Sequence, residues 1–165
     1  MYFPQNLGLA IENLHTKGAF LTVADENKTN TMTIGWGEMG FAWGSEIISV
    51  MVRQTRFTKE ILDKTMEFTV SIPGDDSFKD ALAFCGSKSG KDYDKFSECG
   101  LIALPSEKIK APGISGCKFI FECKVKAVYE MDIEKIVPEI NERWYKDNNY
   151  HTIYTGVILN SKEIY

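Results

Sequence analysis

The chain has 165 residues, 44% of them hydrophobic and 25% charged, which is typical of one globular domain and excludes a disordered or fibrous protein. Its net charge of −4, with no basic stripe, argues against nucleic-acid binding, because contacts from cations to phosphate dominate that affinity. No apolar run approaches the roughly 20 residues that a membrane helix needs, so we expect no membrane partner.

Residues 1–14 lack a basic start followed by an apolar core, so we expect no signal peptide and a cytoplasmic location. The four cysteines, Cys85, Cys99, Cys117 and Cys123, form no C-x-x-C pair, and we expect free thiols packed as small apolar groups. Cys85 is the one candidate for a redox-active thiol, because of its neighbours in the chain. The only two histidines are far apart, so no metal site is expected.

The first third of the chain predicts three β-strands. An apolar run at 19–24 ends in a polar turn, residues 30–36 alternate and run into glycines, and residues 47–52 are rich in β-branched side chains. We expect these three strands to form a meander.

The middle of the chain predicts helices around a further strand. Residues 56–64 favour a helix with Thr58 as its N-cap, and residues 67–72 favour a strand that stops at a Pro-Gly pair. Residues 77–84 place apolar side chains at helical spacing, and residues 93–99 favour a short helix.

The last third predicts a long strand, a helix and a final strand. Residues 118–130 alternate as a half-buried strand does. Part of 133–146 is expected to be helical from near Val137, because Pro138 suits a first helical turn, and residues 152–159 predict the last strand. Strands outnumber helices without regular alternation, so we predict a mostly β (α+β), largely antiparallel barrel with peripheral helices. The glycine spacing at 35–40 runs into a further predicted strand and not into a helix, so the Rossmann fingerprint is missing, and no P-loop motif is present.

Residues 29–37 form the first candidate site. Threonines, an asparagine and a tryptophan stand beside glycines, which allow a ligand to approach the backbone closely. Threonine and asparagine supply hydrogen bonds without charge. The set suits a flat heteroaromatic ring, and an exposed β-turn is the alternative.

Two further segments suit an anion. Residues 52–58 place Arg53, Arg56 and Thr58 at a helix start, where guanidinium, hydroxyl and free N–H groups can converge. Residues 85–92 carry two glycines, two serines and two lysines, which can wrap a phosphate or a ribityl chain. A solvated loop and a flexible surface loop are the alternatives. Together the two loops favour a phosphorylated ligand.

Other aromatic and titratable residues have simpler interpretations. His151 is expected to be a hydrogen-bonded structural histidine rather than a catalyst. Trp43, Trp144 and Tyr145 are expected in the core or at an interface. No Ser-His-Asp or Cys-His arrangement can be argued from the spacing, so no catalytic residue is assigned.

A set of motifs runs in order from about residue 18 to residue 158. They are N-T-M-T at 30–33 with W-G at 36–37, V-R at 52–53 with R-F-T at 56–58, E-F-T-V-S-I-P at 67–73, C-G at 85–86 with S-G at 89–90 and D-K-F at 94–96, E-C-K at 122–124, and His151 with Y-T-G at 154–156. Each motif is weak alone, whereas the ordered set is fairly specific. The set resembles the flavin reductase-like family, and within it the flavoredoxin-type branch.

The resemblance implies one domain over residues 1–165, a split β-barrel that binds FMN, usually as a homodimer with the flavin near the subunit interface. It implies that the isoalloxazine ring lies against the segment Asn30, Thr31, Met32, Thr33 and Trp36. It implies Arg53, Arg56 and Thr58 for the phosphate and ribityl chain, with Ser87, Lys88, Ser89 and Lys91 closing over the phosphate or ring. Lys91 stands where many relatives have arginine, and it keeps the charge without the bidentate geometry.

Three functions follow from the resemblance. The first is an FMN-dependent oxidoreductase that takes electrons from NAD(P)H or from a redox protein. The second is a non-enzymatic electron carrier with tightly held FMN, and the third is an FMN-binding module without turnover. The first function predicts that NAD(P)H reduces the flavin. The second predicts that a reduced redox protein reduces it and NAD(P)H does not. The third predicts bound flavin that neither donor reduces efficiently.

Overall fold

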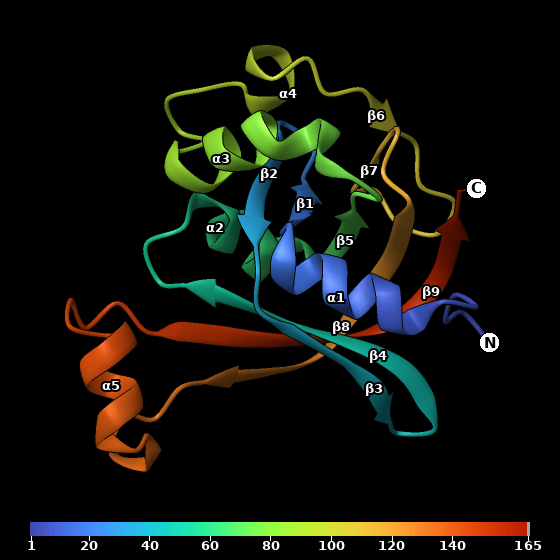
Figure 1. The fold of residues 1–165 in the computed structure, drawn as a ribbon. Helices are drawn as coiled ribbons and strands as arrows, with labels where there is room; N and C mark the ends of the chain where they lie inside the picture. Colours follow the sequence, from blue (N-terminus) through green and yellow to red (C-terminus); the bar gives the residue numbers. More distant parts are fainter. Residues whose placement is uncertain (165) are drawn as a thin grey trace.

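Among the described residues, 1–164, seven strands form one sheet in the order β2-β1-β5-β8-β9-β4-β3, and all of its pairings are antiparallel (Figure 1). The strands are β1 Ala19–Ala24, β2 Thr29–Ile34, β3 Gly37–Ala42, β4 Ser45–Arg53, β5 Glu67–Ile72, β8 Phe119–Glu130 and β9 His151–Glu163. Two short strands, β6 Ala103–Leu104 and β7 Gly113–Ile114, pair separately. The predicted mostly antiparallel β architecture is confirmed.

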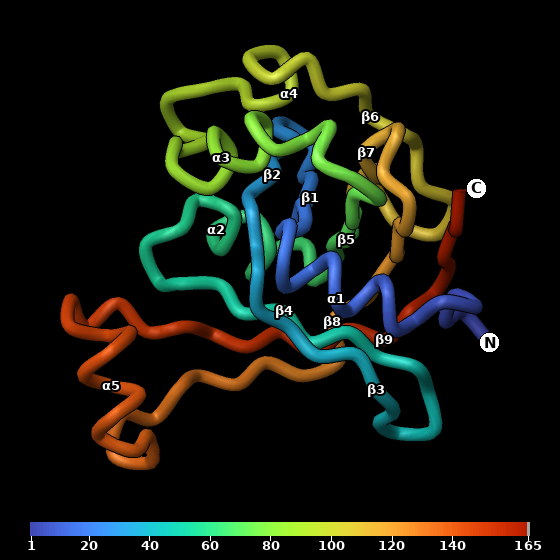
Figure 2. Tube along the Cα trace, viewed as in Figure 1, coloured from blue at the N-terminus to red at the C-terminus, as the bar shows by residue number. Residues whose placement is uncertain are grey.

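The helices lie around this sheet. They are α1 Leu7–Thr16, α2 Phe57–Thr65, α3 Lys79–Ser87, α4 Lys95–Glu98 and α5 Pro138–Trp144, with single 3-10 turns η1 Asp76–Phe78 and η2 Ile133–Lys135. Figure 2 shows the chain leaving β8, turning through α5 and returning into β9 to one side of the barrel. We call this excursion, residues 131–150, the arm. Within residues 1–164 no helix is long and apolar enough to cross a membrane.

The two edge strands of the sheet are consecutive in the chain. Only residues 35 and 36 separate the end of β2 from the start of β3. The chain therefore steps from one edge of the sheet to the other, and the sheet curls into a barrel. The predicted meander is wrong for this reason: β1 pairs with β2, but β4 pairs with β3 and β9.

The core has two parts that share strand β1. Leu21 packs inside the barrel with residues such as Phe68 and Tyr154, whereas its neighbour Phe20 packs under α3 with Leu82. Strand β1 is therefore buried on both faces, which explains its mostly apolar sequence. Burial of each large apolar side chain stabilises the fold by roughly 1.5–3 kcal/mol.

The long strand β8 departs from its predicted half-buried pattern. Its first five residues are buried on both faces, and exposed positions begin only at Lys124. Glu122 lies in the buried stretch because its carboxylate accepts hydrogen bonds from the backbone N–H groups of Glu107 and Lys108 and from Asn160. The alternation predicts the strand correctly, but not the loop that covers it.

Helix α2 begins two residues earlier than a cap at Thr58 predicts. Arg56 is the N-cap, and Thr58 lies inside the first turn, where its Oγ1 accepts a hydrogen bond from Asn30 Nδ2 at 2.9 Å. The assignment of Thr58 as N-cap is therefore wrong, because its hydroxyl is used by strand β2. The predicted start of α5 is confirmed, with Val137 as N-cap and Pro138 in the first turn. Helix α1 and strand β3 were not predicted.

Candidate functional site

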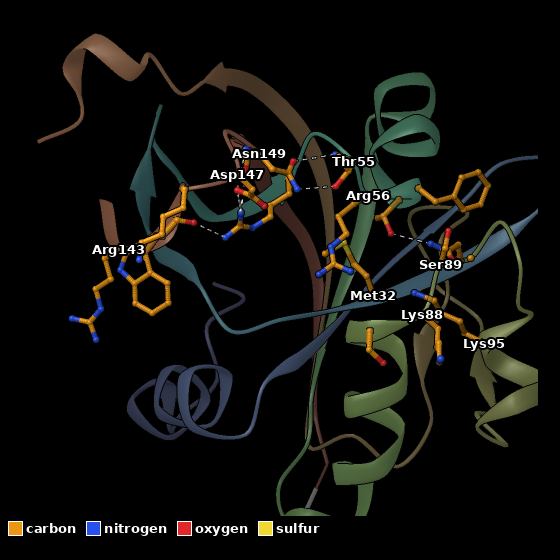
Figure 3. Close-up of a pocket in the computed structure, with 17 residues that line it drawn as sticks. Met32, Thr55, Arg56, Lys88, Ser89, Lys95, Arg143, Asp147 and Asn149 are labelled. Carbon is orange, nitrogen blue, oxygen red and sulfur yellow. Dashed lines mark hydrogen bonds and ion pairs between the residues drawn. The ribbon is translucent and has the colours of Figure 1, made fainter. Parts of the chain in front are cut away.

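A cavity of about 490 Å³ opens between β2, the start of α2, the loop after α3 and the arm (Figure 3). The predicted site residues that line it are Asn30, Met32, Arg53, Arg56, Thr58, Ser87, Lys88 and Ser89. The others are Thr55, Phe57, Gly90, Lys95, Arg143, Trp144, Lys146, Asp147 and Asn149. We call it the polar cavity, because its wall is dominated by cations, hydroxyls and amides.

A second cavity of about 240 Å³ adjoins the first. Its lining residues are Met32, Thr33, Ile34, Gly35, Trp36, Met51, Arg53, Arg56, Trp144 and His151. We call it the aromatic cavity. The two cavities share Met32, Arg53, Arg56 and Trp144. The fold therefore brings all three predicted segments to one continuous site.

Two of the predicted site residues lie outside both linings. The side chain of Thr31 is fully buried on the other side of β2, where its Oγ1 donates to the Leu21 carbonyl and accepts from Thr22. Alternation along the strand places it opposite Met32. Lys91 is half exposed and pairs with Glu60 at 2.6 Å.

One end of the polar cavity holds two cations without an acidic partner. Lys95 is 4% exposed, and its Nζ donates to the backbone carbonyl of Cys85 at 2.8 Å. Arg56 donates to the carbonyl of Gly86 at 2.8 Å. Within residues 1–164 no carboxylate lies within 4.0 Å of either cation. Burial lowers the pKa of both groups. The charge of Arg53 lowers the pKa of Arg56 further, and the charge of Arg56 lowers that of Lys95. A bound anion at this end would relieve that cost.

The loop after α3 packs closely on strand β2. A Cβ atom at Gly90 would overlap the side chain of Asn30, so only glycine fits there. Asn30 is 2% exposed and holds Thr58 through its Nδ2. The ammonium group of Lys28 donates to the Gly90 carbonyl and fixes the loop from the other side. This packing sets the position of Ser87, Lys88 and Ser89 in the cavity wall.

Indole rings form much of the aromatic cavity. The rings of Trp36 and Trp144 meet edge to face with centroids 4.8 Å apart, and the His151 ring lies 5.5 Å from Trp36. Trp144, which was expected in the core or at an interface and not beside a ligand, lines both cavities. Such walls suit a flat ring.

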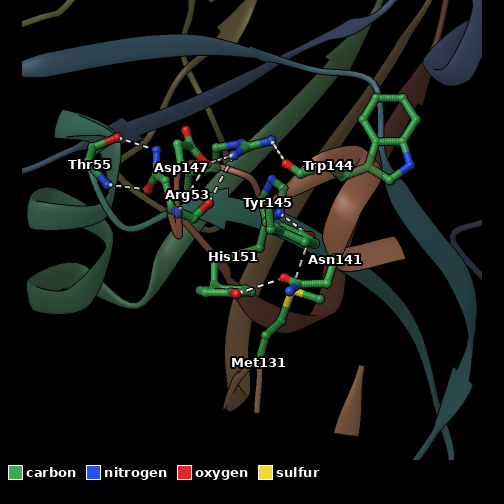
Figure 4. Close-up of polar contacts among 10 residues, drawn as sticks. Arg53, Thr55, Met131, Asn141, Trp144, Tyr145, Asp147 and His151 are labelled. Atoms are coloured by element: carbon green, nitrogen blue, oxygen red, sulfur yellow. Dashed lines mark hydrogen bonds and ion pairs between the residues drawn. The ribbon is translucent and has the colours of Figure 1, made fainter. Parts of the chain in front are cut away.

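His151 is held in a neutral state beside this cavity. Its Nδ1 lies 2.7 Å from the hydroxyl of Tyr145, which also contacts Met131 Sδ (Figure 4). Burial, followed by the charges of Arg53 and Arg56, lowers the pKa of His151 to about 4. The imidazole is therefore uncharged at neutral pH and can offer a hydrogen bond without a fixed charge.

Cys85 lies behind the anion end of the site. Its thiol is fully buried, and burial together with neighbouring Cys99 raises its pKa to about 12. A thiol with that pKa is not an activated nucleophile at neutral pH.

Sequence reasoning missed three of the lining residues that matter most. Lys95 stands in the D-K-F motif, and Asp94 accepts hydrogen bonds from the first turn of α4, which starts the helix there. Nothing in the local sequence says that the following lysine is buried. Trp144 reaches the site because the arm folds back on β4, and His151 reaches it because β9 pairs with β4 opposite Arg53. Both are contacts between distant segments.

Comparisons with known proteins agree with this arrangement. A family model described as "Flavin reductase like domain" matches residues 12–161. A protein of Archaeoglobus fulgidus is 26% identical over 149 residues, which are 90% of this chain and 73% of that protein.

Solved structures share the fold. Flavoredoxin of Desulfovibrio vulgaris has a TM-score of 0.70 at 22% identity, over 90% of this chain and 70% of its own. Flavoredoxin from Methanosarcina acetivorans has a TM-score of 0.70 at 21% identity, over 90% and 68%. An FMN-binding protein from Thermus thermophilus, solved with p-hydroxybenzaldehyde, has a TM-score of 0.70 at 19% identity, over 89% and 71%. The fold is thus that of the flavin reductase-like split barrels, and the chain belongs to the flavin reductase like domain family.

Proposed function

We propose that residues 1–165 form a single domain that binds FMN across the two cavities and transfers electrons through it as an oxidoreductase. The electrons would come from NAD(P)H or from a redox protein. The observation that carries the proposal is the pair of cations, Lys95 and Arg56, which stand without an acidic partner at the end of a cavity that continues into aromatic walls. A ligand with an anion at one end and a flat ring at the other fits that layout.

The residues of the polar cavity fit a phosphate. Arg56 and Lys95 supply charge, and Thr58, Ser87 and Ser89 supply hydroxyl groups from two separate segments. Hydrogen bonds between cations and phosphate oxygens are about twice as strong as neutral ones. Selectivity for FMN over riboflavin is expected to reside here, because only FMN carries the phosphate.

The residues of the aromatic cavity fit the ring. Met32 and Trp36 offer apolar contact, and neutral His151 offers a hydrogen bond. When bound, a flavin supplies the electron transfer itself, while the protein supplies binding, orientation and electrostatics. The positive charges of Arg53 and Arg56 beside this cavity would favour the more negative, reduced ring.

We also propose a homodimer. Large apolar side chains on the arm, Ile133, Val137, Ile140 and Trp144, recur every three or four residues and are 40–58% exposed. Helix α5 buries none of its residues in the single chain. Exposed apolar stripes of this kind mark interfaces. Sedimentation equilibrium tests it: wild type should be dimeric and Ile140→Asp monomeric, and a monomeric wild type would end the proposal.

Anaerobic addition of NADH or NADPH to the FMN-loaded protein tests the enzyme assignment. Loss of the flavin absorbance at about 450 nm is expected if NADH or NADPH is the donor. Absorbance that persists with nicotinamide but falls with a reduced redox protein would make the chain an electron carrier. Absorbance that resists both would make it a binding module.

We also propose a cytoplasmic location, which subcellular fractionation tests.

A further inference from the structure

The side-chain hydrogen bonds of Arg53 all go to residues of the arm. Its Nη1 donates to the Asn149 carbonyl at 3.0 Å and reaches the Asp147 carboxylate at 3.5 Å, and its Nη2 donates to the Trp144 carbonyl at 3.0 Å. Its guanidinium carbon also lies 5.3 Å from the centre of the Tyr145 ring. Three of its five N–H groups therefore face the arm (Figure 4).

Arg56, three residues further on, has a different environment. Within the described chain the Arg56 guanidinium donates to one group only, the Gly86 carbonyl. It donates no hydrogen bond to the arm. It lines both cavities beside Lys95. The two arginines are equivalent in the sequence motif but not in the fold, since Arg53 uses three N–H groups on the arm and Arg56 uses one on the Gly86 carbonyl, which leaves Arg56 more donors for an anion.

The arm carries residues that complete the site. Trp144 lines both cavities, and Tyr145 holds the imidazole of His151. Besides Arg53, a reciprocal pair of hydrogen bonds between Thr55 and Asn149 ties the arm to the end of β4. If this attachment is lost, the wall of the aromatic cavity and the orientation of His151 are lost with it.

We infer that Arg53 is a positioning residue that docks the arm on the cavity, and that it is not the phosphate ligand that its place beside Arg56 predicts. The inference rests on the proposed function for its ligand, FMN. It assigns phosphate recognition to Arg56 and Lys95, and it makes ring binding depend on the arm.

The experiment compares Arg53→Lys, Arg56→Lys and Asn149→Ala with wild type. Lysine keeps the charge but cannot hold two carbonyls in a fork. Affinities for FMN and for riboflavin are measured by quenching of flavin fluorescence. In parallel, brief trypsin treatment followed by mass spectrometry gives the cleavage rate in the arm at Lys135, Arg143 and Lys146, with cleavage at Lys28 as the internal reference for general unfolding.

Arg53→Lys should weaken FMN and riboflavin by the same factor, about tenfold, and speed cleavage in the arm about tenfold without change at Lys28. Asn149→Ala leaves every cation in place and should give the same pattern more weakly. Arg56→Lys should weaken FMN much more than riboflavin and leave arm cleavage unchanged.

The inference is overturned if Arg53→Lys weakens FMN selectively while the arm stays protected, or if it changes neither affinity nor cleavage. A wild-type protein that binds neither flavin would instead defeat the proposed function. The cleavage pattern would still decide whether Arg53 docks the arm, so the two failures can be told apart.

Discussion

The ammonium group of Lys95 and the guanidinium group of Arg56 donate to successive backbone carbonyls, those of Cys85 and Gly86, in the last turn of helix α3. The last carbonyls of a helix lack partners within the helix and carry partial negative charge. The end of α3 therefore gathers two cations from separate segments and partly compensates them. Their remaining donors are available to an anion in the polar cavity.

Replacing Lys95 by methionine tests whether the cations at the end of α3 bind the phosphate. Lys95→Met removes the buried charge but keeps the length of the side chain, and it should weaken FMN by about ten- to a hundredfold, since a charged hydrogen bond contributes roughly 1.5–3 kcal/mol. Riboflavin affinity should change by less than about threefold. Lys79→Met, at an exposed position at the start of helix α3, is the matched control and should change neither affinity. Equal losses for both flavins in Lys95→Met would refute the phosphate assignment.

A methyl group at Gly90, in the loop after α3, should displace the wall of the polar cavity. The new Cβ would overlap the Asn30 side chain, which must then leave Thr58 and move the wall of the polar cavity. We expect Gly90→Ala to lower the free energy of unfolding by about 1–3 kcal/mol, the usual cost of overpacking, and to weaken FMN. Gly40→Ala, where a Cβ meets nothing within 4 Å, is the control. Urea unfolding of both variants measures the difference, and equal stabilities would contradict the packing argument.

How much of this could be predicted from sequence depends on the range of the interactions. Local signals located most strands, and the ordered motifs led to the family. Strand pairing was mispredicted for β4, because the two-residue step between β2 and β3 does not reveal that it joins opposite edges of a sheet. The cap at Thr58 was mispredicted because its hydroxyl bonds Asn30, 28 residues earlier.

The site shows the same division. Arg56 and the 30–36 segment were predicted from local chemistry, and all of them except Thr31 line the cavities. Lys95 and Trp144 were not, because their burial and placement depend on α3 and on the arm. Arg53 was assigned to the phosphate because the motif gives no sign of the arm carbonyls that it contacts.

The buried imidazole of His151 should make stability depend on pH. Its pKa is lowered to about 4, below the ordinary value of 6.5, so between these values the unfolded chain binds more protons than the folded one. Stability from this group is complete above pH 6.5 and falls as the pH drops toward 4, by about 3 kcal/mol in all. His151→Gln should remove that part of the slope in urea unfolding at several pH values. His15→Gln, at an exposed position, should keep it, and identical slopes in wild type and His151→Gln would contradict the assignment.

The thiols should differ in reactivity according to burial. Cys85, Cys117 and Cys123 are buried, and burial raises the pKa of each, whereas Cys99 is only partly buried. Titration with a chromogenic disulfide reagent near pH 8 should detect at most one fast thiol in the folded protein, and Cys99→Ser should remove it. All four should react in urea. Fast modification of Cys85 in the folded protein would show that it is more accessible than the structure allows.

Binding of FMN itself tests the central claim most directly. The purified protein, freed of any bound flavin, is titrated with FMN and with riboflavin while flavin fluorescence and the visible spectrum are followed. The account predicts saturable binding of FMN with one site per chain, with affinity at least about tenfold above that for riboflavin. Failure to bind FMN, or equal affinity for the two flavins, would contradict it.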